Sequence, residues 1–150
     1  MSETSGARPD PAFQSRRWRF GNALVAVFAR IGIGPIQLLI TRGRKSGRPH
    51  TNPVVPVEVD GKTWLVAPYG PASWVHNARA NGRVTLRYGR AKGDYAVREV
   101  GAAEAGPVLK RYVAVATKTR PQFDAKKDSP VEDFIAEADR RPVFELSPLS

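Results

Sequence analysis

Two pairs of short apolar runs, each pair joined by a tight-turn signal, constrain the fold of this chain most strongly. The runs are residues 53–59 and 62–67, and residues 84–88 and 94–100. Asp60 and Gly61 separate the first pair and favour a type I′ hairpin turn, and a glycine-bounded turn at residues 89–93 separates the second. Because a hairpin pairs its strands antiparallel, two hairpins predict an antiparallel sheet rather than a parallel one with crossover helices.

Three helical patterns and two further strands complete the expected domain. The helices are expected at residues 74–81, 103–117 and 129–138, and the strands at residues 36–41 and 143–146. Gly82 is placed to end the first helix. Ser129 and Glu132 have the spacing of a capping box, with Pro130 at the first helical position. We therefore expect one α+β or mainly β domain over residues 34–150, an antiparallel sheet closed into a small barrel with helices outside.

The charge of the chain predicts an anionic partner. Lys and Arg number 24 against 14 Asp and Glu, a formal net charge of +10. Such a field attracts nucleic acid, an acidic membrane surface or a polyanionic small molecule. The chain has no cysteine and two histidines, His50 and His76, so thiol catalysis and disulfides are excluded and no metal site is expected.

The N-terminal segment divides into a polar tail and an amphipathic helix. Residues 1–12 are polar and expected to be disordered, and residues 13–33 are expected to contain the helix. A twin-arginine signal matches poorly, and the uncharged run at residues 20–29 is too short to span a bilayer. Packing on the domain is the default for the helix, and peripheral membrane contact through residues 13–31 is the alternative.

A basic loop follows the first expected strand. Four cationic side chains, Arg42, Arg44, Lys45 and Arg48, lie within seven residues that also hold two glycines. We expect the glycines to let consecutive N–H groups converge on one phosphate or carboxylate, with the cations adding charge-assisted bonds. The spacing is not that of a Walker P-loop. A solvated basic turn and a nucleic-acid contact are the alternatives, although residues 42–48 contain no aromatic side chain for base stacking.

The second informative stretch is the helix that begins near Trp74. Trp74 and Asn77 are three residues apart, so they share a helix face. An indole beside an amide suits packing against a planar heterocycle and bonding its edge. A core tryptophan with a surface asparagine is the alternative.

Together, the basic loop, the Asp-Gly hairpin and the Trp-x-x-Asn-x-x-Ala-Asn pattern at residues 74–81 resemble the deazaflavin-dependent nitroreductase/quinone reductase family of actinobacteria. The resemblance runs by motif over residues 38–88 and more loosely to the C-terminus. It implies a split β-barrel related to FMN-binding oxidoreductases. It also implies coenzyme F420, a deazaflavin with a ribityl-phosphate-lactyl-polyglutamate tail, and reduction of an activated alkene, a quinone or a nitro compound.

The resemblance also implies a set of site residues. The cofactor-binding residues would be Arg44, Lys45, Ser46, Gly47, Arg48, His50, Pro53, Val54, Ala67, Pro68, Tyr69, Gly70, Trp74 and Asn77. Among them the residues of the basic loop would hold the phosphate, and residues 67–70 would line the deazaflavin. The polyglutamate tail of the cofactor would follow the remaining positive surface. Tyr69 and Tyr112 are the candidate proton donors.

Several alternatives stay open at this point. FMN is the alternative cofactor. The alternative function is that of a split-barrel protein that binds a lipid, a tetrapyrrole or a membrane surface. The expected partners are the anionic cofactor and a small hydrophobic substrate, with nucleic acid disfavoured, in a monomer or homodimer. We expect a cytoplasmic protein, with membrane association as the alternative.

Overall fold

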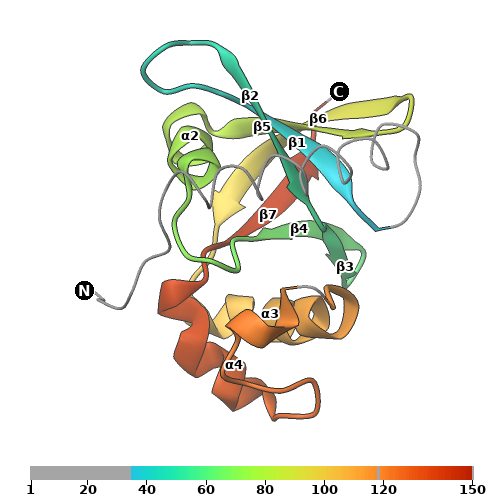
Figure 1. Ribbon diagram of the computed structural model, residues 1–150, viewed down its shortest axis with the longest axis vertical. Helices are drawn as coiled ribbons and strands as arrows, with labels where there is room; N and C mark the ends of the chain where they lie inside the picture. Colours follow the sequence, from blue (N-terminus) through green and yellow to red (C-terminus); the bar gives the residue numbers. More distant parts are fainter. Residues whose placement is uncertain (1–34, 118, 150) are drawn as a thin grey trace, which may run out of the picture.

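The computed structural model describes residues 35–117 and 119–149 (Figure 1). The expected tail at residues 1–12 and helix at residues 13–33 lie outside this part of the chain. No helix within the described residues is long and apolar enough to cross a membrane.

Seven antiparallel strands form one curled sheet. They are β1 (Gln37–Arg42), β2 (Pro49–Val54), β3 (Val57–Val59), β4 (Lys62–Val66), β5 (Arg83–Tyr88), β6 (Ala91–Glu99) and β7 (Val143–Pro148). Their order is β2-β1-β5-β6-β7-β4-β3, which places β2 and β3 at opposite edges. Only residues 55 and 56 join these two strands, a reach of roughly 10 Å. The edges must therefore approach each other, and the sheet curls into a half-barrel, which confirms the expected antiparallel barrel.

The basic loop is shorter than expected, and the strand after it begins earlier. Residues 49–52 belong to β2, which pairs with β1 in the register Arg42↔Pro49 to Gln37↔Val54. The expected strand at residues 53–59 is wrong as a single element, because it is interrupted at residues 55 and 56. Pro56 has no N–H donor, which disfavours a continuous ladder there.

Both expected hairpins are present. Asp60 and Gly61 have φ values of 54° and 74°, as a type I′ turn requires, and they join β3 to β4. The β5–β6 turn is tighter than expected, because the strands already pair at Tyr88↔Ala91. The closing strand β7 lies inside the sheet, between β6 and β4.

The sheet has apolar side chains on both faces, and a different helix layer covers each. Helix α2 (Ser73–Asn81) packs on the inner face of the curled sheet, over a cluster that includes Leu39, Leu65, Val84 and Phe144 and that we call the inner core. Helix α3 (Ala102–Val115) covers the β3–β4 end of the outer face, and α4 (Val131–Glu137) packs against α3. Figure 1 shows α3 and α4 at the end of the molecule opposite the β1–β2 turn.

The C-terminal end of α2 is as the sequence predicts, whereas the N-terminal end of α4 is not. Gly82 ends α2 in the left-handed conformation, φ 70°, and its N–H donates to the carbonyl of Ala78 at 2.8 Å. The expected capping box before α4 is wrong. Pro130, not Ser129, is the N-cap, and the Ser129 hydroxyl instead accepts from the Lys126 N–H at 2.8 Å. Two short 3₁₀ turns, η1 (Arg120–Gln122) and η2 (Ala138–Arg140), flank α4.

Candidate functional site

The basic loop between β1 and β2 is closed by its own hydrogen bonds. The Gly43 N–H donates to the Arg48 carbonyl at 2.7 Å, and the Gly47 N–H donates to the Gly43 carbonyl at 2.9 Å. Gly47 has φ +73°, and a Cβ on buried Gly43 would lie 2.7 Å from the Ser46 hydroxyl and 2.8 Å from the His50 ring. The two glycines therefore allow a compact turn: Gly47 adopts a left-handed backbone conformation, and Gly43 leaves room for the Ser46 and His50 side chains.

Most backbone donors of this loop are occupied, which corrects the expectation that consecutive N–H groups converge on one anion. Besides Gly43 and Gly47, the Arg48 N–H donates to the Ser46 hydroxyl oxygen at 3.1 Å, and the Arg44 N–H donates to the Asn77 side chain. Within residues 35–117 and 119–149, only the N–H groups of Lys45 and Ser46 in this turn have no partner. An anion here would therefore be held mainly by side chains.

Asn77 on α2 connects the helix to the loop and to β1. Its Oδ1 accepts hydrogen bonds from the Arg44 N–H at 3.1 Å and from Arg44 Nη1 at 3.0 Å. Its Nδ2 donates to the Thr41 hydroxyl at 3.2 Å. Asn77 and Thr41 are each 2% exposed, so neither side chain has water as a ready replacement. The carboxamide thus holds the Arg44 guanidinium in one place before any ligand arrives.

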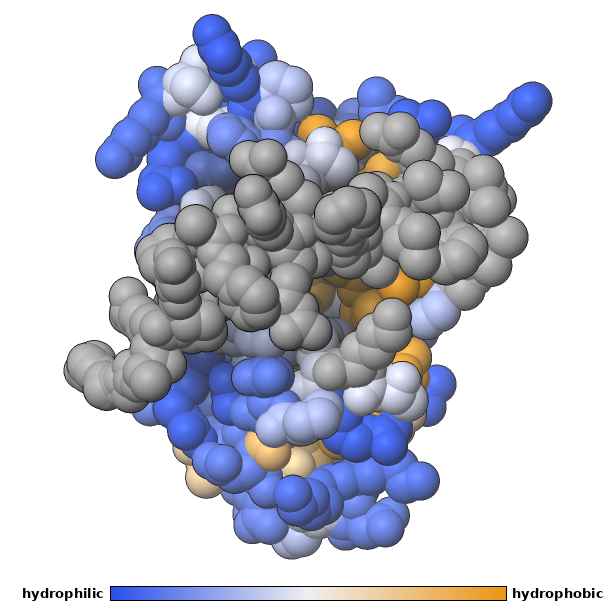
Figure 2. Space-filling model, viewed as in Figure 1, coloured by the Kyte–Doolittle hydropathy of each residue, from blue (hydrophilic) through white to orange (hydrophobic). Residues whose placement is uncertain are grey.

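The loop presents further cations that are not neutralised. The side chains of Lys45 and Arg48 are exposed, and neither has a hydrogen-bond or ion-pair partner among the described residues. Figure 2 shows hydrophilic side chains gathered over the end of the molecule where Figure 1 draws the β1–β2 turn. Positive charge with no internal counter-ion is suited to binding an external anion.

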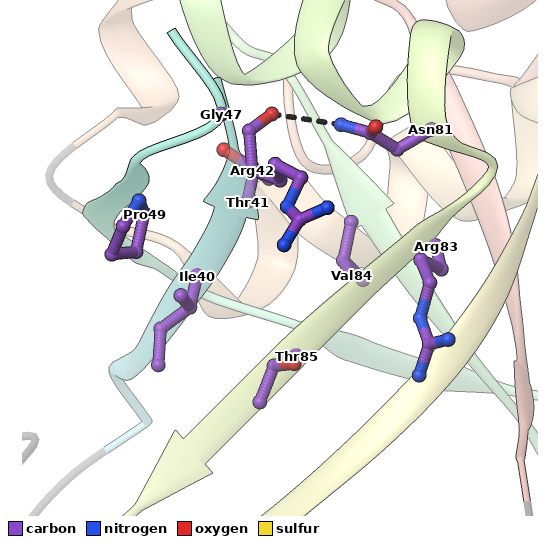
Figure 3. A pocket seen from close by; sticks show the side chains of 9 residues that line it. All are labelled: Ile40, Thr41, Arg42, Gly47, Pro49, Asn81, Arg83, Val84 and Thr85. Carbon is purple, nitrogen blue, oxygen red and sulfur yellow. Dashed lines mark hydrogen bonds between the residues drawn. The ribbon is translucent and has the colours of Figure 1, made fainter. Parts of the chain in front are cut away.

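A cavity of about 510 Å³ adjoins the loop on the β1–β5 side of the sheet (Figure 3). Its lining residues are Ile40, Thr41, Arg42, Gly47, Pro49, Asn81, Arg83, Val84 and Thr85. Asn81 Nδ2 donates to the Arg42 carbonyl at 2.7 Å, which ties the end of α2 to the start of the loop. The Arg42 guanidinium has no partner among the described residues, and Arg83 has a loose ion pair with Asp94 at 3.5 Å.

The segment that leads into α2 contains the second group of expected site residues. Ala67 is 1% exposed and Tyr69 is 62% exposed, while Gly70 has φ +91° and is buried. Trp74 is 7% exposed and packs edge-on against Phe144, with ring centroids 5.8 Å apart. The structure therefore places this tryptophan in the inner core, as the alternative interpretation held. Asn77 departs from that alternative, because it is buried rather than at the surface.

The two tyrosines named as proton donors have different surroundings. Tyr112 is 3% exposed on α3, and its phenol oxygen accepts from the Thr119 hydroxyl at 2.9 Å. Burial raises its pKa to about 12. Tyr112 lies on α3, which Figure 1 draws toward the opposite end of the molecule from the β1–β2 turn. Tyr69 is the one whose phenol reaches solvent.

The remaining expected residues lie on or beside the loop. His50, Pro53 and Val54 are on β2, with His50 exposed and Val54 packed against the inner core. Thr41 and Asn81 were not singled out as site residues by the sequence, although both stand within the recognised motifs. Their hydrogen bonds to Asn77 and to the Arg42 carbonyl could be found only from the fold.

Comparison with known proteins identifies the family and the fold. The family model described as "F420H(2)-dependent quinone reductase" matches residues 14–132. A solved F420-H2 dependent reductase is 29% identical, with a TM-score of 0.50 over 75% of this chain and 94% of that one. A protein described as a domain-swapped dimer is 23% identical, with a TM-score of 0.54 over 92% of this chain and all of the other. An FAD-binding protein from Mesorhizobium loti shares the fold at 15% identity, with a TM-score of 0.51 over 85% of this chain and 90% of that one.

The matched segment spans the closed cationic loop, the helix that fixes it and most of the curled sheet. The chain therefore belongs to the F420H(2)-dependent quinone reductase family: it is an oxidoreductase on a split-barrel fold, and its cofactor is coenzyme F420.

Proposed function

We propose that this protein transfers a hydride from reduced F420 to an electron-poor organic acceptor, namely an activated alkene, a quinone or a nitro compound. The single observation that carries the proposal is the closed turn at residues 43–48. It holds Arg44 in place through Asn77 and leaves the side chains of Lys45 and Arg48 without a partner among the residues that the structure describes. This donor set fits a phosphate, because two or three cationic side chains can share its oxygens.

Arg44, Lys45, Ser46 and Arg48 would hold the cofactor phosphate. The Ser46 hydroxyl oxygen already accepts from the Arg48 N–H, and its proton remains available to donate to an anion. The adjoining cavity continues from this loop, since Gly47 and Pro49 form part of its lining. Arg42 and Arg83 would there face the carboxylates of the anionic tail, which gives the net charge of +10 a local role.

The segment at residues 67–70 would lie along the ring. Ala67, Pro68 and Gly70 offer little polar side-chain chemistry, which suits the exclusion of water from a flat apolar surface. Trp74 would support this segment from the core side, because it packs on Phe144 and shares the inner core with Ala67. His50, Pro53 and Val54 on β2 would complete the cofactor-binding set.

When bound, reduced F420 supplies the hydride from C5 of its deazaflavin ring. The protein then has to orient the ring, exclude water and deliver one proton to the acceptor. We propose the Tyr69 hydroxyl as the proton donor, because this phenol is exposed and can regain its proton from solvent. Tyr112 is the less suitable donor, because it is buried on α3 and bonded to Thr119.

Fluorescence titration tests the proposal directly. Adding the purified protein to F420 should quench or shift the cofactor fluorescence at micromolar protein, and FMN should compete weakly. The same deazaflavin without the phosphate and the groups beyond it should bind much more weakly, because the loop contacts are then missing. Equal affinity for the two compounds, or stronger binding of FMN, would refute the assignment of the loop. A panel of quinones, nitro compounds and activated alkenes with F420H2 would then identify the acceptor.

The oligomeric state is a separate part of the proposal. The structural relative described as a domain-swapped dimer supports a homodimer as the state to test first. Light scattering on the purified protein distinguishes a mass near 16 kDa from twice that value.

A further inference from the structure

An arginine outside the cationic loop, with a largely but not fully buried side chain, joins three segments of the chain. Arg141 lies between η2 and β7, and its side chain is 12% exposed. Its Nη1 donates to the Pro68 carbonyl at 2.7 Å, and its Nη2 donates to the Gln122 carbonyl. The same Nη2 lies 3.4 Å from the Glu137 carboxylate, and the guanidinium is 4.9 Å from the centre of the Phe123 ring.

Among the described residues, the segment at residues 67–70 makes its hydrogen bonds to the rest of the chain with Arg141 and Pro142. The Ala67 N–H donates to the Pro142 carbonyl at 2.9 Å. A Cβ on Gly70 would lie 3.5 Å from the Arg140 carbonyl, so the backbones pass close together. Residues 140–142 therefore act as a clamp on the segment that leads into α2.

Removing this guanidinium from water costs free energy, so stabilisation of the fold does not by itself explain the arginine at position 141. Its Nε is buried with no partner among the described residues, and a buried donor left unpaired costs free energy. Replacing a buried ion pair by apolar residues is often neutral or stabilising. The planar guanidinium group can bond two carbonyl oxygens in one fixed geometry, which neither an apolar side chain nor a lysine can do.

We propose that Arg141 is a positioning residue for hydride transfer. It sets the place of the Pro68 carbonyl, and with it Tyr69, relative to the cofactor ring. This inference rests on the proposed function, in which residues 67–70 lie along the ring. A displacement of about 1 Å in a reacting geometry can cost on the order of a hundredfold in rate. The phosphate contacts are made by the β1–β2 turn, a separate element, so cofactor affinity should respond much less.

The test compares Arg141→Lys with Arg140→Gln. Arg140 is the matched control, because its side chain contacts Asp124 at 3.3 Å and Glu137 at 3.8 Å but no carbonyl of residues 67–70. Hydrogen exchange at the Ala67 and Gly70 amides is measured in the cofactor-free protein. The value of kcat with F420H2 and the Kd for F420 are measured on the same preparations.

For Arg141→Lys we expect exchange at least tenfold faster at both amides, kcat about 10- to 100-fold lower, and Kd within about threefold of the wild type. Arg140→Gln should match the wild type in all three. Should Arg141→Lys fold poorly, Arg141→Met is the second variant and should show the same pattern, because Glu137 keeps its hydrogen bonds from the Asp124 and Ala125 N–H groups and its 3.8 Å contact with Arg140.

Two results would overturn the inference. One is a variant with a lower melting temperature but wild-type exchange and kcat, which would make Arg141 purely structural. The other is faster exchange with unchanged kcat, which would show that the clamp exists but that its position does not matter for the reaction. If the wild type itself neither binds nor oxidises F420H2, the proposed function fails, whereas the exchange measurement still reports on the clamp.

Discussion

Replacing Asn77 by alanine should both destabilise the protein and weaken its hold on the anionic cofactor. The substitution removes three hydrogen bonds, two from Arg44 and one to Thr41. Arg44 is exposed and can turn to water, but Thr41 is 2% exposed and its hydroxyl would be left without its partner. A buried unpaired hydroxyl costs about 1–3 kcal/mol, and the lost Arg44 contacts add about 1 kcal/mol. A total near 3 kcal/mol corresponds to a fall of roughly 6–12 °C in the melting temperature for a domain of this size.

The affinity for F420 should fall about tenfold in the same variant, the equivalent of about 1.4 kcal/mol, because Arg44 is no longer held in place. Thermal denaturation and fluorescence titration measure the two effects. Asn77→Asp separates them: its carboxylate can still accept from Arg44 and from the Thr41 hydroxyl, but it neutralises the cation. Its stability should stay closer to the wild type, while its affinity for F420 still falls.

Asn52→Ala is the matched control, since the Asn52 side chain has no hydrogen-bond partner within residues 35–117 and 119–149. It should change the melting temperature by less than about 2 °C, as typical for a side chain that contributes no specific contact. Wild-type melting temperature and wild-type F420 affinity in Asn77→Ala would show that Asn77 does not hold Arg44 in place.

The remaining predictions concern the loop cations and the helical layer. Lys45→Ala and Arg48→Ala should each weaken F420 binding by about five- to tenfold at low salt and by less at high salt, measured by fluorescence titration; an effect that is independent of salt would argue against a charge contact. Tyr112→Phe should leave kcat within about twofold of the wild type, because Tyr112 lies on α3, away from the loop; a hundredfold loss would make it the proton donor after all. Burial raises the Tyr112 pKa from 10.0 to about 12, so between these pH values the Tyr112 phenol stays protonated in the folded protein but ionises in the unfolded chain. The melting temperature should therefore fall more steeply between pH 10 and 12 in the wild type than in Tyr112→Phe. Gly106→Ala should cost about 1–3 kcal/mol of stability, since its Cβ would lie 2.5 Å from Ile135, with F420 affinity unchanged in the folded protein; a variant as stable as the wild type in urea denaturation would contradict this.

Local chemistry made several elements predictable from the sequence. Asp60 and Gly61 specify a type I′ turn because both accept positive φ, and Gly82 ends α2 for the same reason. The apolar face of α3 follows from the spacing of its side chains. The cations of the loop and the pattern that begins at Trp74 were likewise visible, and together they indicated the family that the comparison found.

How these elements meet depends on contacts between segments that are far apart in the sequence. Residues 49–52 carry no strong strand pattern and became β2 because β1 offers them a partner. The sheet curls because β2 and β3, joined by only two residues, lie at its opposite edges. Asn77 lies 36 residues from Thr41, and Arg141 lies 73 residues from Pro68, so no local pattern could link them. Periodicity records which face of an element is apolar, but it does not say which distant segment will cover that face. Local sequence therefore accounts for the turns, the helix faces and the charge of the site, whereas the packing of distant segments determines which of those residues hold one another in place.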